Sequence, residues 1–252
     1  MKKALCFFLL LPVLLSAETI QTDGAVFHCR IPETCHAGSK IMVLFGGRNQ
    51  PGDRTLKAFD FNALAEKHRL ILLSPSFSGR TYWEPEHRSG QQLKQAVRQL
   101  ERRYRLKSPK LYFYGYSAGG QCAALFYQWM PDQVAAWGVH ACGVYPDDIR
   151  CSRAPCLITC GTEDRDRFRI SRLFVCRYRE HGGLLLWKYF PGAGHELSPQ
   201  ALELAKVWFD DLLSGRGVIA YGEDDTRKIH KETDAAFRSP LYSETLTELW
   251  LK

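Results

Sequence analysis

The sequence predicts an α/β fold in which helices flank a mostly parallel central sheet, with no large cap domain. Apolar runs of strand length alternate with longer segments of helical periodicity, the order that gives parallel strands joined by crossover helices. The connection between the expected strands at residues 134–139 and 155–160 is short, which leaves no room for a cap. With 252 residues, 45% of them hydrophobic, the chain fits one large domain with a buried core.

The bounds of the expected strands and helices follow from the apolar runs, from the helical periodicity and from the turn residues between them. Apolar runs bounded by turn signals indicate strands over residues 25–29, 39–45, 70–73, 111–114, 134–139, 155–160 and 184–190. Helical periodicity indicates helices over residues 61–68, 91–105, 119–130, 167–181 and 199–213. The first strand is expected at the sheet edge, and Gly182-Gly183 marks the end of the fourth helix.

The N-terminus has the pattern of a secretory signal peptide. Lys2 and Lys3 precede an uninterrupted apolar run over residues 4–15, and Ser16-Ala17-Glu18 follows. A basic start, a short apolar core and a small residue before a polar one are typical of such peptides, and the run is short for a membrane span. We therefore expect residues 1–17 to be removed after Ala17, with no stable membrane anchor and export to the periplasm or the external medium.

The cysteine count agrees with export. All nine cysteines except Cys6 follow the expected signal peptide, and an even number in an exported chain suggests disulfides. Cys29 and Cys35 bracket a turn short enough to be bridged, and Cys142 and Cys151 bracket a short loop. Cys156 and Cys160 lie four residues apart on one expected strand, too far to pair with each other. The lack of a C-x-x-C pair and the histidine spacing argue against a metal site.

The net charge of +7 raises the question of a nucleic-acid partner. Much of the positive charge recurs every three to four residues along the expected helix 91–105, opposite an apolar stripe that includes Leu93, Val97 and Leu100. That pattern is typical of an amphipathic helix with a solvated basic face. We therefore expect no nucleic-acid partner, while attraction to an anionic surface or polymer stays open.

The expected strand over residues 111–114 ends in Gly115-Tyr116-Ser117-Ala118-Gly119-Gly120, and a helix follows. A serine in G-x-S-x-G at a strand-to-helix corner is the nucleophile elbow of the α/β-hydrolases. The glycines give room for a tight turn, and a strained backbone lifts the serine hydroxyl to the N-terminus of a helix. Ser117 is therefore the candidate nucleophile. A glycine-rich turn in another α/β protein is the alternative.

Two later loops supply partners for the serine in the chain order Ser, acid, His. Gly161-Thr162-Glu163-Asp164-Arg165-Asp166 follows the strand over residues 155–160, and Asp164 is the candidate acid with Asp166 in reserve. Gly192-Ala193-Gly194-His195 lies between the last strand and the last helix, which makes His195 the candidate base. His140 also ends a strand, but it precedes the acid loop and falls outside this order.

Further site residues follow from loop position. Phe45-Gly46-Gly47 resembles the His-Gly-x entry of the oxyanion loop with Phe in place of His, so the amides of Gly47 and Ala118 are the candidate oxyanion donors. Loops after parallel strands lie where ligands bind in α/β sheets. We therefore expect Phe77, Tyr82 and Trp83, with Tyr116 beside the nucleophile, to contact substrate. The loop aromatics could equally be packing residues.

Together, GYSAGG, the segment MPDQVAA at residues 130–136, GTED and GAGH resemble secreted α/β-hydrolases of the polyhydroxybutyrate depolymerase and feruloyl esterase type. The likeness covers residues 39–213, while Phe45 and the C-terminal tail depart from it. The resemblance implies cleavage of a carboxylic ester by a Ser-His-Asp triad, without metal or cofactor. The absence of a cap favours bulky or polymer-attached substrates. The resemblance does not indicate which acyl and alcohol groups the ester contains, because substrate choice varies widely within such families.

The expected organisation is a signal peptide (1–17), an α/β-hydrolase catalytic domain (18–214) and a C-terminal extension (215–252) packed on or beside it. Two other functions stay open. One is a serine peptidase of the prolyl oligopeptidase type, whose catalytic domains share a G-x-S-x-G-G elbow. The other is a secreted binding module that keeps the fold without chemistry. The sequence does not indicate the oligomeric state.

Overall fold

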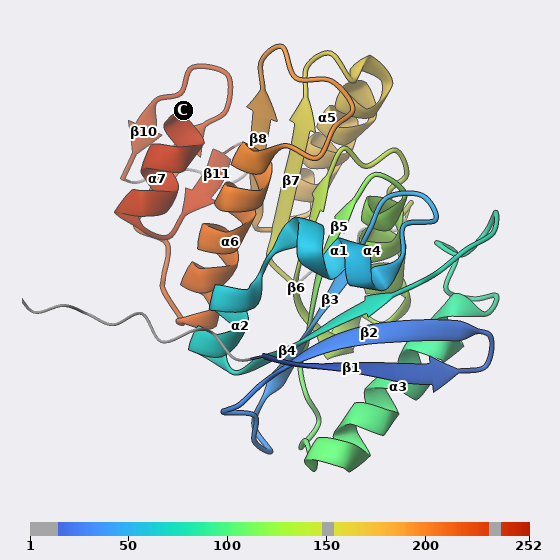
Figure 1. Cartoon of the computed structure of the whole chain (residues 1–252). Coiled ribbons are helices and arrows are strands. Elements are labelled where there is room, and N and C mark those ends of the chain that lie inside the picture. The colour runs from blue at the N-terminus through green and yellow to red at the C-terminus, as the bar shows by residue number, and fades with distance from the viewer. Residues whose placement is uncertain (1–14, 148–153, 232–237) are drawn as a thin grey trace, which may run out of the picture.

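The computed structural model describes residues 15–147, 154–231 and 238–252, and its centre is an eight-stranded sheet (Figure 1). The strands run in the order β1-β2-β4-β3-β5-β6-β7-β8. From β4 to β8 all neighbours pair in parallel, whereas β1 with β2 and β2 with β4 pair antiparallel. Their bounds are β1 Leu15–Thr22, β2 Ala25–Pro32, β3 Lys40–Phe45, β4 Leu70–Pro75, β5 Leu111–Tyr116, β6 Val134–His140, β7 Cys156–Gly161 and β8 Leu185–Phe190. The predicted fold class is confirmed.

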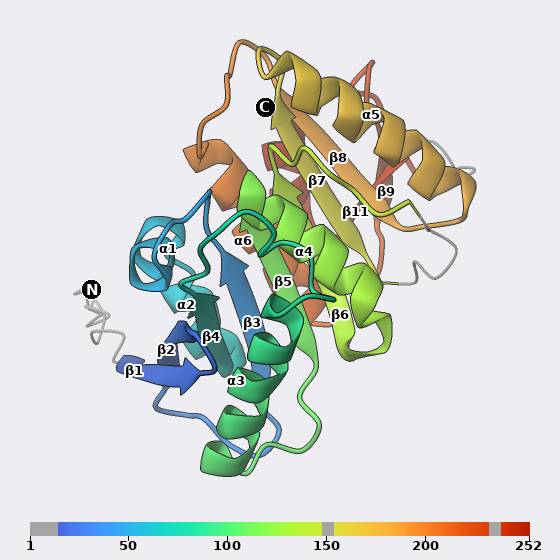
Figure 2. The same ribbon diagram turned by 90° about the vertical axis from the view of Figure 1, so that its right-hand side faces the viewer.

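Helices cover both faces of the sheet, so there are two hydrophobic cores. One face packs against α3 (Ser89–Tyr104), α4 (Ala118–Trp129) and α5 (Arg165–Glu180), which lie in front of the sheet in Figure 2. The other packs against α1 (Gly52–Phe59), α2 (Asn62–His68), α6 (Pro199–Leu213) and α7 (Glu244–Leu251). A 3-10 turn, Pro131–Gln133, leads from α4 into β6. Because the central strands are covered on both sides, their side chains are apolar along nearly their whole length.

The sheet edge differs from the prediction. The segment 25–29 was expected at the edge, but it lies in β2, and β1 forms the edge beside it. Thr22 pairs with Ala25 around the two-residue turn Asp23-Gly24, where Gly24 has φ +80°, and Asp-Gly is a favoured hairpin turn. Residues 1–14 of the expected signal peptide lie outside the described structure, and residues 15–17 belong to β1.

The C-terminal region folds onto the other edge of the sheet. β9 (Ala220–Glu223), β10 (Ile229–His230) and β11 (Arg238–Leu241) form a small sheet in the order β10-β9-β11, seen beside β8 in Figure 1. Ser239 Oγ accepts a hydrogen bond from the Trp187 amide (2.8 Å), and Trp250 Nε1 donates to the Trp187 carbonyl (2.8 Å). These bonds satisfy backbone groups of the edge strand β8 that would otherwise invite pairing with another chain.

The disulfide prediction for Cys29 and Cys35 is wrong. Cys29 and Cys35 are free thiols, so the predicted bridge between them is not formed. Cys29 points into the core from β2, and burial raises the pKa of its thiol to about 12, which keeps it protonated and unreactive. Cys142 is also a free, buried thiol, and its expected partner Cys151 lies outside the described residues.

Within the described part of the chain, no helix combines the length and the apolar character needed to cross a membrane.

Candidate active site

Ser117 occupies a strained corner between β5 and α4. Its backbone has φ 56° and ψ −119°, a region that non-glycine residues rarely adopt, and its amide donates to the His140 carbonyl (2.9 Å). The flanking glycines leave no room for a side chain. A Cβ at Gly115 would lie 2.0 Å from the Gly119 carbonyl oxygen, and a Cβ at Gly119 would lie 2.1 Å from the Phe45 carbonyl oxygen. The elbow therefore packs directly against the end of β3.

Three side chains meet at this corner. Ser117 Oγ lies 2.9 Å from His195 Nε2, and His195 Nδ1 lies 2.6 Å from Asp164 Oδ2. A carboxylate only accepts, so Nδ1 carries the proton and Nε2 accepts from the serine hydroxyl. The other oxygen of Asp164, Oδ1, accepts from Arg167 Nη1 (3.2 Å). The elbow loop, the β7 loop and the β8 loop each supply one member of this chain of hydrogen bonds.

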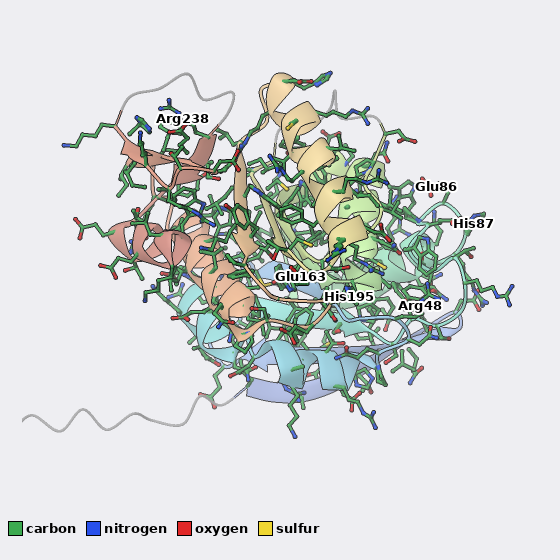
Figure 3. All side chains as sticks on the ribbon, turned by 90° about the horizontal axis from the view of Figure 1, so that it is seen from above. Arg48, Glu86, His87, Glu163, His195 and Arg238 are labelled. Atoms are coloured by element: carbon green, nitrogen blue, oxygen red, sulfur yellow. The ribbon has the colours of Figure 1, made fainter. Side chains whose placement is uncertain are left out.

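Among the three acids of the β7 loop, burial and contact separate the candidates. Asp164 is 7% exposed and bonds to His195, whereas Glu163 and the reserve acid Asp166 are exposed. In the view from above, His195 and Glu163 lie on neighbouring loops, and Arg238 lies apart in the C-terminal region (Figure 3). Arg167, three residues after Asp164, was not singled out in the sequence, although this spacing in the first turn of a helix is a recognisable signal for an ion pair.

The amides of the two candidate oxyanion donors differ in their hydrogen bonding. Ala118 is the first residue of α4, so its amide has no partner inside the helix. The Gly47 amide donates to the side-chain oxygen of Gln50 (3.2 Å), a contact that the sequence analysis missed. The Gly47 backbone lies against Tyr116, whose ring carbons are 3.5 Å from the position of an added Cβ.

The loop aromatics divide into core and surface residues. Phe77 and Tyr82 are buried in the core beside Phe126, and the Tyr82 hydroxyl accepts from the Asn49 amide (3.2 Å). The cavity they line with Gly47 is about 10 Å³, too small for a substrate group. Both residues also line a second cavity of about 300 Å³, together with Arg80 and Arg88. Trp83 is only partly buried, and the Arg48 guanidinium lies 5.6 Å from its ring centroid. Of the three expected loop contacts, Trp83 is the least buried, and it lies beside Arg48 of the loop after β3.

Tyr116 contacts two histidine rings. Its ring stacks on His195 (5.4 Å, 24°) and on His140 (5.9 Å, 22°), and its hydroxyl donates to the His195 carbonyl (3.2 Å). His140 is 1% exposed, with Nε2 2.9 Å from the Glu196 carbonyl and Nδ1 2.9 Å from Thr159 Oγ1. Burial, with a smaller contribution from His195, lowers the pKa of His140 to about 4. His140 is therefore a neutral imidazole.

The lowered pKa predicts that His140 destabilises the protein in acid. Below pH 6.5 the unfolded chain binds a proton at His140 that the folded chain does not bind, so stability falls as the pH drops from 6.5 to 4. The full effect is about 3 kcal/mol. Urea unfolding of wild type and His140→Gln between pH 4 and 7.5 checks this, because the difference between the two curves isolates His140. An unchanged difference across this range would contradict the prediction.

In residues 15–147, 154–231 and 238–252, no group of three or more His, Cys, Asp and Glu side chains is arranged to hold a metal ion.

No protein-family model matches the chain, and no curated protein matches it. Solved structures do match. A thermostable esterase superposes with a TM-score of 0.60 at 15% identity, over 71% of this chain and 55% of that chain. The chain has the α/β-hydrolase fold. It spans about half the length of that esterase.

Two further solved structures match this chain over a larger share of their own length. A poly(3-hydroxybutyrate) depolymerase from Bordetella parapertussis has a TM-score of 0.59 and 15% identity, over 79% of this chain and 91% of that one. A ferulic acid esterase has a TM-score of 0.60 and 13% identity, over 79% and 95%. At these identities the likeness concerns the fold, and at that level the resemblance predicted from the sequence motifs is confirmed.

Proposed function

We propose that the protein is an exported serine hydrolase that cleaves carboxylic esters through an acyl-enzyme intermediate. One observation carries the proposal: Ser117, His195 and Asp164 form a continuous chain of hydrogen bonds of 2.9 and 2.6 Å on a strained elbow. A nucleophile bonded to a base, itself oriented by a third group, is the arrangement that activates a serine hydroxyl. Export is supported by the sequence of residues 1–17.

The proposed reaction uses each group in turn. His195 Nε2 takes the proton of Ser117 as Oγ attacks the acyl carbon, and Asp164 stabilises the imidazolium that forms. The Ala118 and Gly47 amides hold the oxyanion, each contributing about 3 kcal/mol in comparable sites. His195 then gives its proton to the leaving alcohol. Water, deprotonated by the same imidazole, attacks the acyl-enzyme and releases the acid and Ser117.

The hydrogen bond between the Gly47 amide and Gln50 adds a step to this scheme. The amide bonds to Gln50 Oε1 before substrate arrives, so the substrate oxygen has to replace that side-chain oxygen. The developing oxyanion is the stronger acceptor because a hydrogen bond to a charged group exceeds one to a neutral amide. The exchange therefore favours the transition state over the uncharged ester.

The openness of the site supports the proposed substrate class. The His195 side chain is 35% exposed, and the connection from β6 to β7 spans only residues 141–155. A site without a cap suits esters that are bulky or attached to a polymer. The depolymerase and esterase neighbours support this substrate class by analogy of fold.

A fluorophosphonate probe followed by intact-mass analysis tests the proposal. We expect one adduct, at Ser117, together with turnover of p-nitrophenyl esters and none of peptide anilides. Turnover of the anilides instead would favour the peptidase alternative. Absence of both labelling and ester turnover in the folded protein would contradict the proposal and favour a binding module.

A further inference from the structure

The loop that carries His195 has little support from its own sequence. It reads Pro191-Gly192-Ala193-Gly194-His195, and an added Cβ at Gly192 or Gly194 would meet no atom within 4 Å. Glycine gives the backbone more conformations than any other residue. An imidazole at the end of such a segment keeps its place only if the surrounding structure holds the backbone.

The β7 loop holds the first half of this segment. The Gly192 amide donates to Thr162 Oγ1 (2.9 Å), and the Ala193 carbonyl accepts from the Glu163 amide (2.9 Å). Both bonds lie before His195 in the chain. They fix where the loop leaves β8, but they leave the backbone at His195 and beyond it unattached.

Two side chains from neighbouring strands hold the second half. Tyr116, at the end of β5, donates to the carbonyl of His195, and His140, at the end of β6, bonds to the carbonyl of Glu196. A carbonyl only accepts, so neutral His140 carries its proton on Nε2. Its Nδ1 lies 2.9 Å from Thr159 Oγ1, a hydroxyl that is also 3.2 Å from the Val139 carbonyl. Tyr116 and His140 are register partners in the sheet, which places their rings in contact.

The same two rings also support the imidazole itself. Tyr116 stacks on the face of His195, and His140 in turn stacks on Tyr116. We propose that Tyr116 and His140 are positioning residues that clamp the carbonyls of residues 195 and 196 and the face of the His195 ring, so that Nε2 stays aligned with Ser117. The proposal rests on the proposed function of His195 as the base.

The clamp acts through orientation, so its loss should affect kcat more than KM. A displacement of about 1 Å in a reacting group lowers a rate by up to about 10²-fold. Tyr116→Phe keeps the stacked ring and removes one bond, for which we expect kcat to fall about 10-fold. His140→Leu removes a bond and a ring contact, for which we expect a loss of about 30-fold. KM for a short p-nitrophenyl ester should change less than about twofold in both variants.

His140→Gln and Tyr114→Phe are the matched variants. A glutamine amide reaches close to the position of Nε2 and donates in its place, so His140→Gln should recover kcat to within about threefold of wild type. Tyr114 lies two residues before Tyr116 on β5, and its hydroxyl is buried without a hydrogen-bond partner among the described residues. Tyr114→Phe should therefore leave kcat unchanged. Thermal unfolding of each variant shows whether it is folded at the assay temperature.

Hydrogen–deuterium exchange of the peptide covering residues 190–198 tests the clamp without any turnover. We expect faster exchange in Tyr116→Phe and His140→Leu, and wild-type exchange in His140→Gln and Tyr114→Phe. Wild-type exchange and wild-type kcat in folded Tyr116→Phe and His140→Leu would overturn the clamp, as would an equal loss in His140→Gln. If wild type neither reacts with a fluorophosphonate nor cleaves esters, the proposed function fails, and the exchange result still decides whether the clamp holds the loop.

Discussion

Ser117→Ala is expected to lower kcat for p-nitrophenyl esters by about 10⁴-fold or more and to leave the protein folded. The hydroxyl is the proposed nucleophile, and loss of a triad serine removes the whole triad contribution because its members act as a unit. Both alanine and serine carry a Cβ at the same strained φ of 56°, so the backbone strain is unchanged. Steady-state kinetics and urea unfolding measure the two effects.

Fluorophosphonate labelling is the control for this variant. The adduct seen in wild type should be absent from Ser117→Ala, which shows that no other serine reacts. The free energy of unfolding should differ from that of wild type by no more than about 1 kcal/mol, because the hydroxyl bonds only to a partly exposed imidazole. Substantial residual turnover in the folded variant would remove Ser117 from the mechanism.

Asp164→Asn is expected to lower kcat by about 10⁴-fold, for a reason specific to this structure. Arg167 donates to Oδ1, so the asparagine oxygen must occupy that position, and the amide NH2 then faces His195. An NH2 group cannot accept from Nδ1, so the imidazole moves its proton to Nε2 and can no longer accept from Ser117. Loss of the correct tautomer in a comparable triad has an effect of this size.

The role of Arg167 supplies a rescue experiment. In the double variant Asp164→Asn, Arg167→Ala, the amide is free to turn its oxygen toward Nδ1, so kcat should rise at least about 10-fold above that of Asp164→Asn alone. Asp166 is the exposed alternative to Asp164, so Asp166→Asn should leave kcat within about twofold of wild type. A large loss in Asp166→Asn, or no recovery in the double variant, would contradict this account of the acid.

The sequence predicted most of the central sheet because its strands are short apolar runs that end in glycine, proline or polar loops. Residues 111–114, for example, lie within β5, and the glycines after them form the elbow. The chain order Ser, acid, His selected Ser117, Asp164 and His195, and the structure brings their side chains within hydrogen-bonding distance.

The features that the sequence did not predict are an exposed edge strand, a sheet of very short strands, and contacts between residues far apart in the chain. β1 was missed because only Ile20 is buried along it, so its apolar pattern is weak, and because residues 15–17 were assigned to the signal peptide. The small C-terminal sheet was missed because its strands have only two to four residues. The contacts of Tyr116 with His140 and His195 depend on strand pairing and on a loop far along the chain, neither of which leaves a local signal.

The short connection between β6 and β7 has a consequence for kinetics on aggregated substrates. Lipases that hide their nucleophile beneath a mobile helix become more active when an oil–water interface opens it. Here the connection comprises residues 141–155, and in the described structure Ser117 and His195 are both partly exposed, so they are accessible without any opening step. The rate should therefore rise smoothly with ester concentration through the critical micelle concentration, without the abrupt increase that marks interfacial activation.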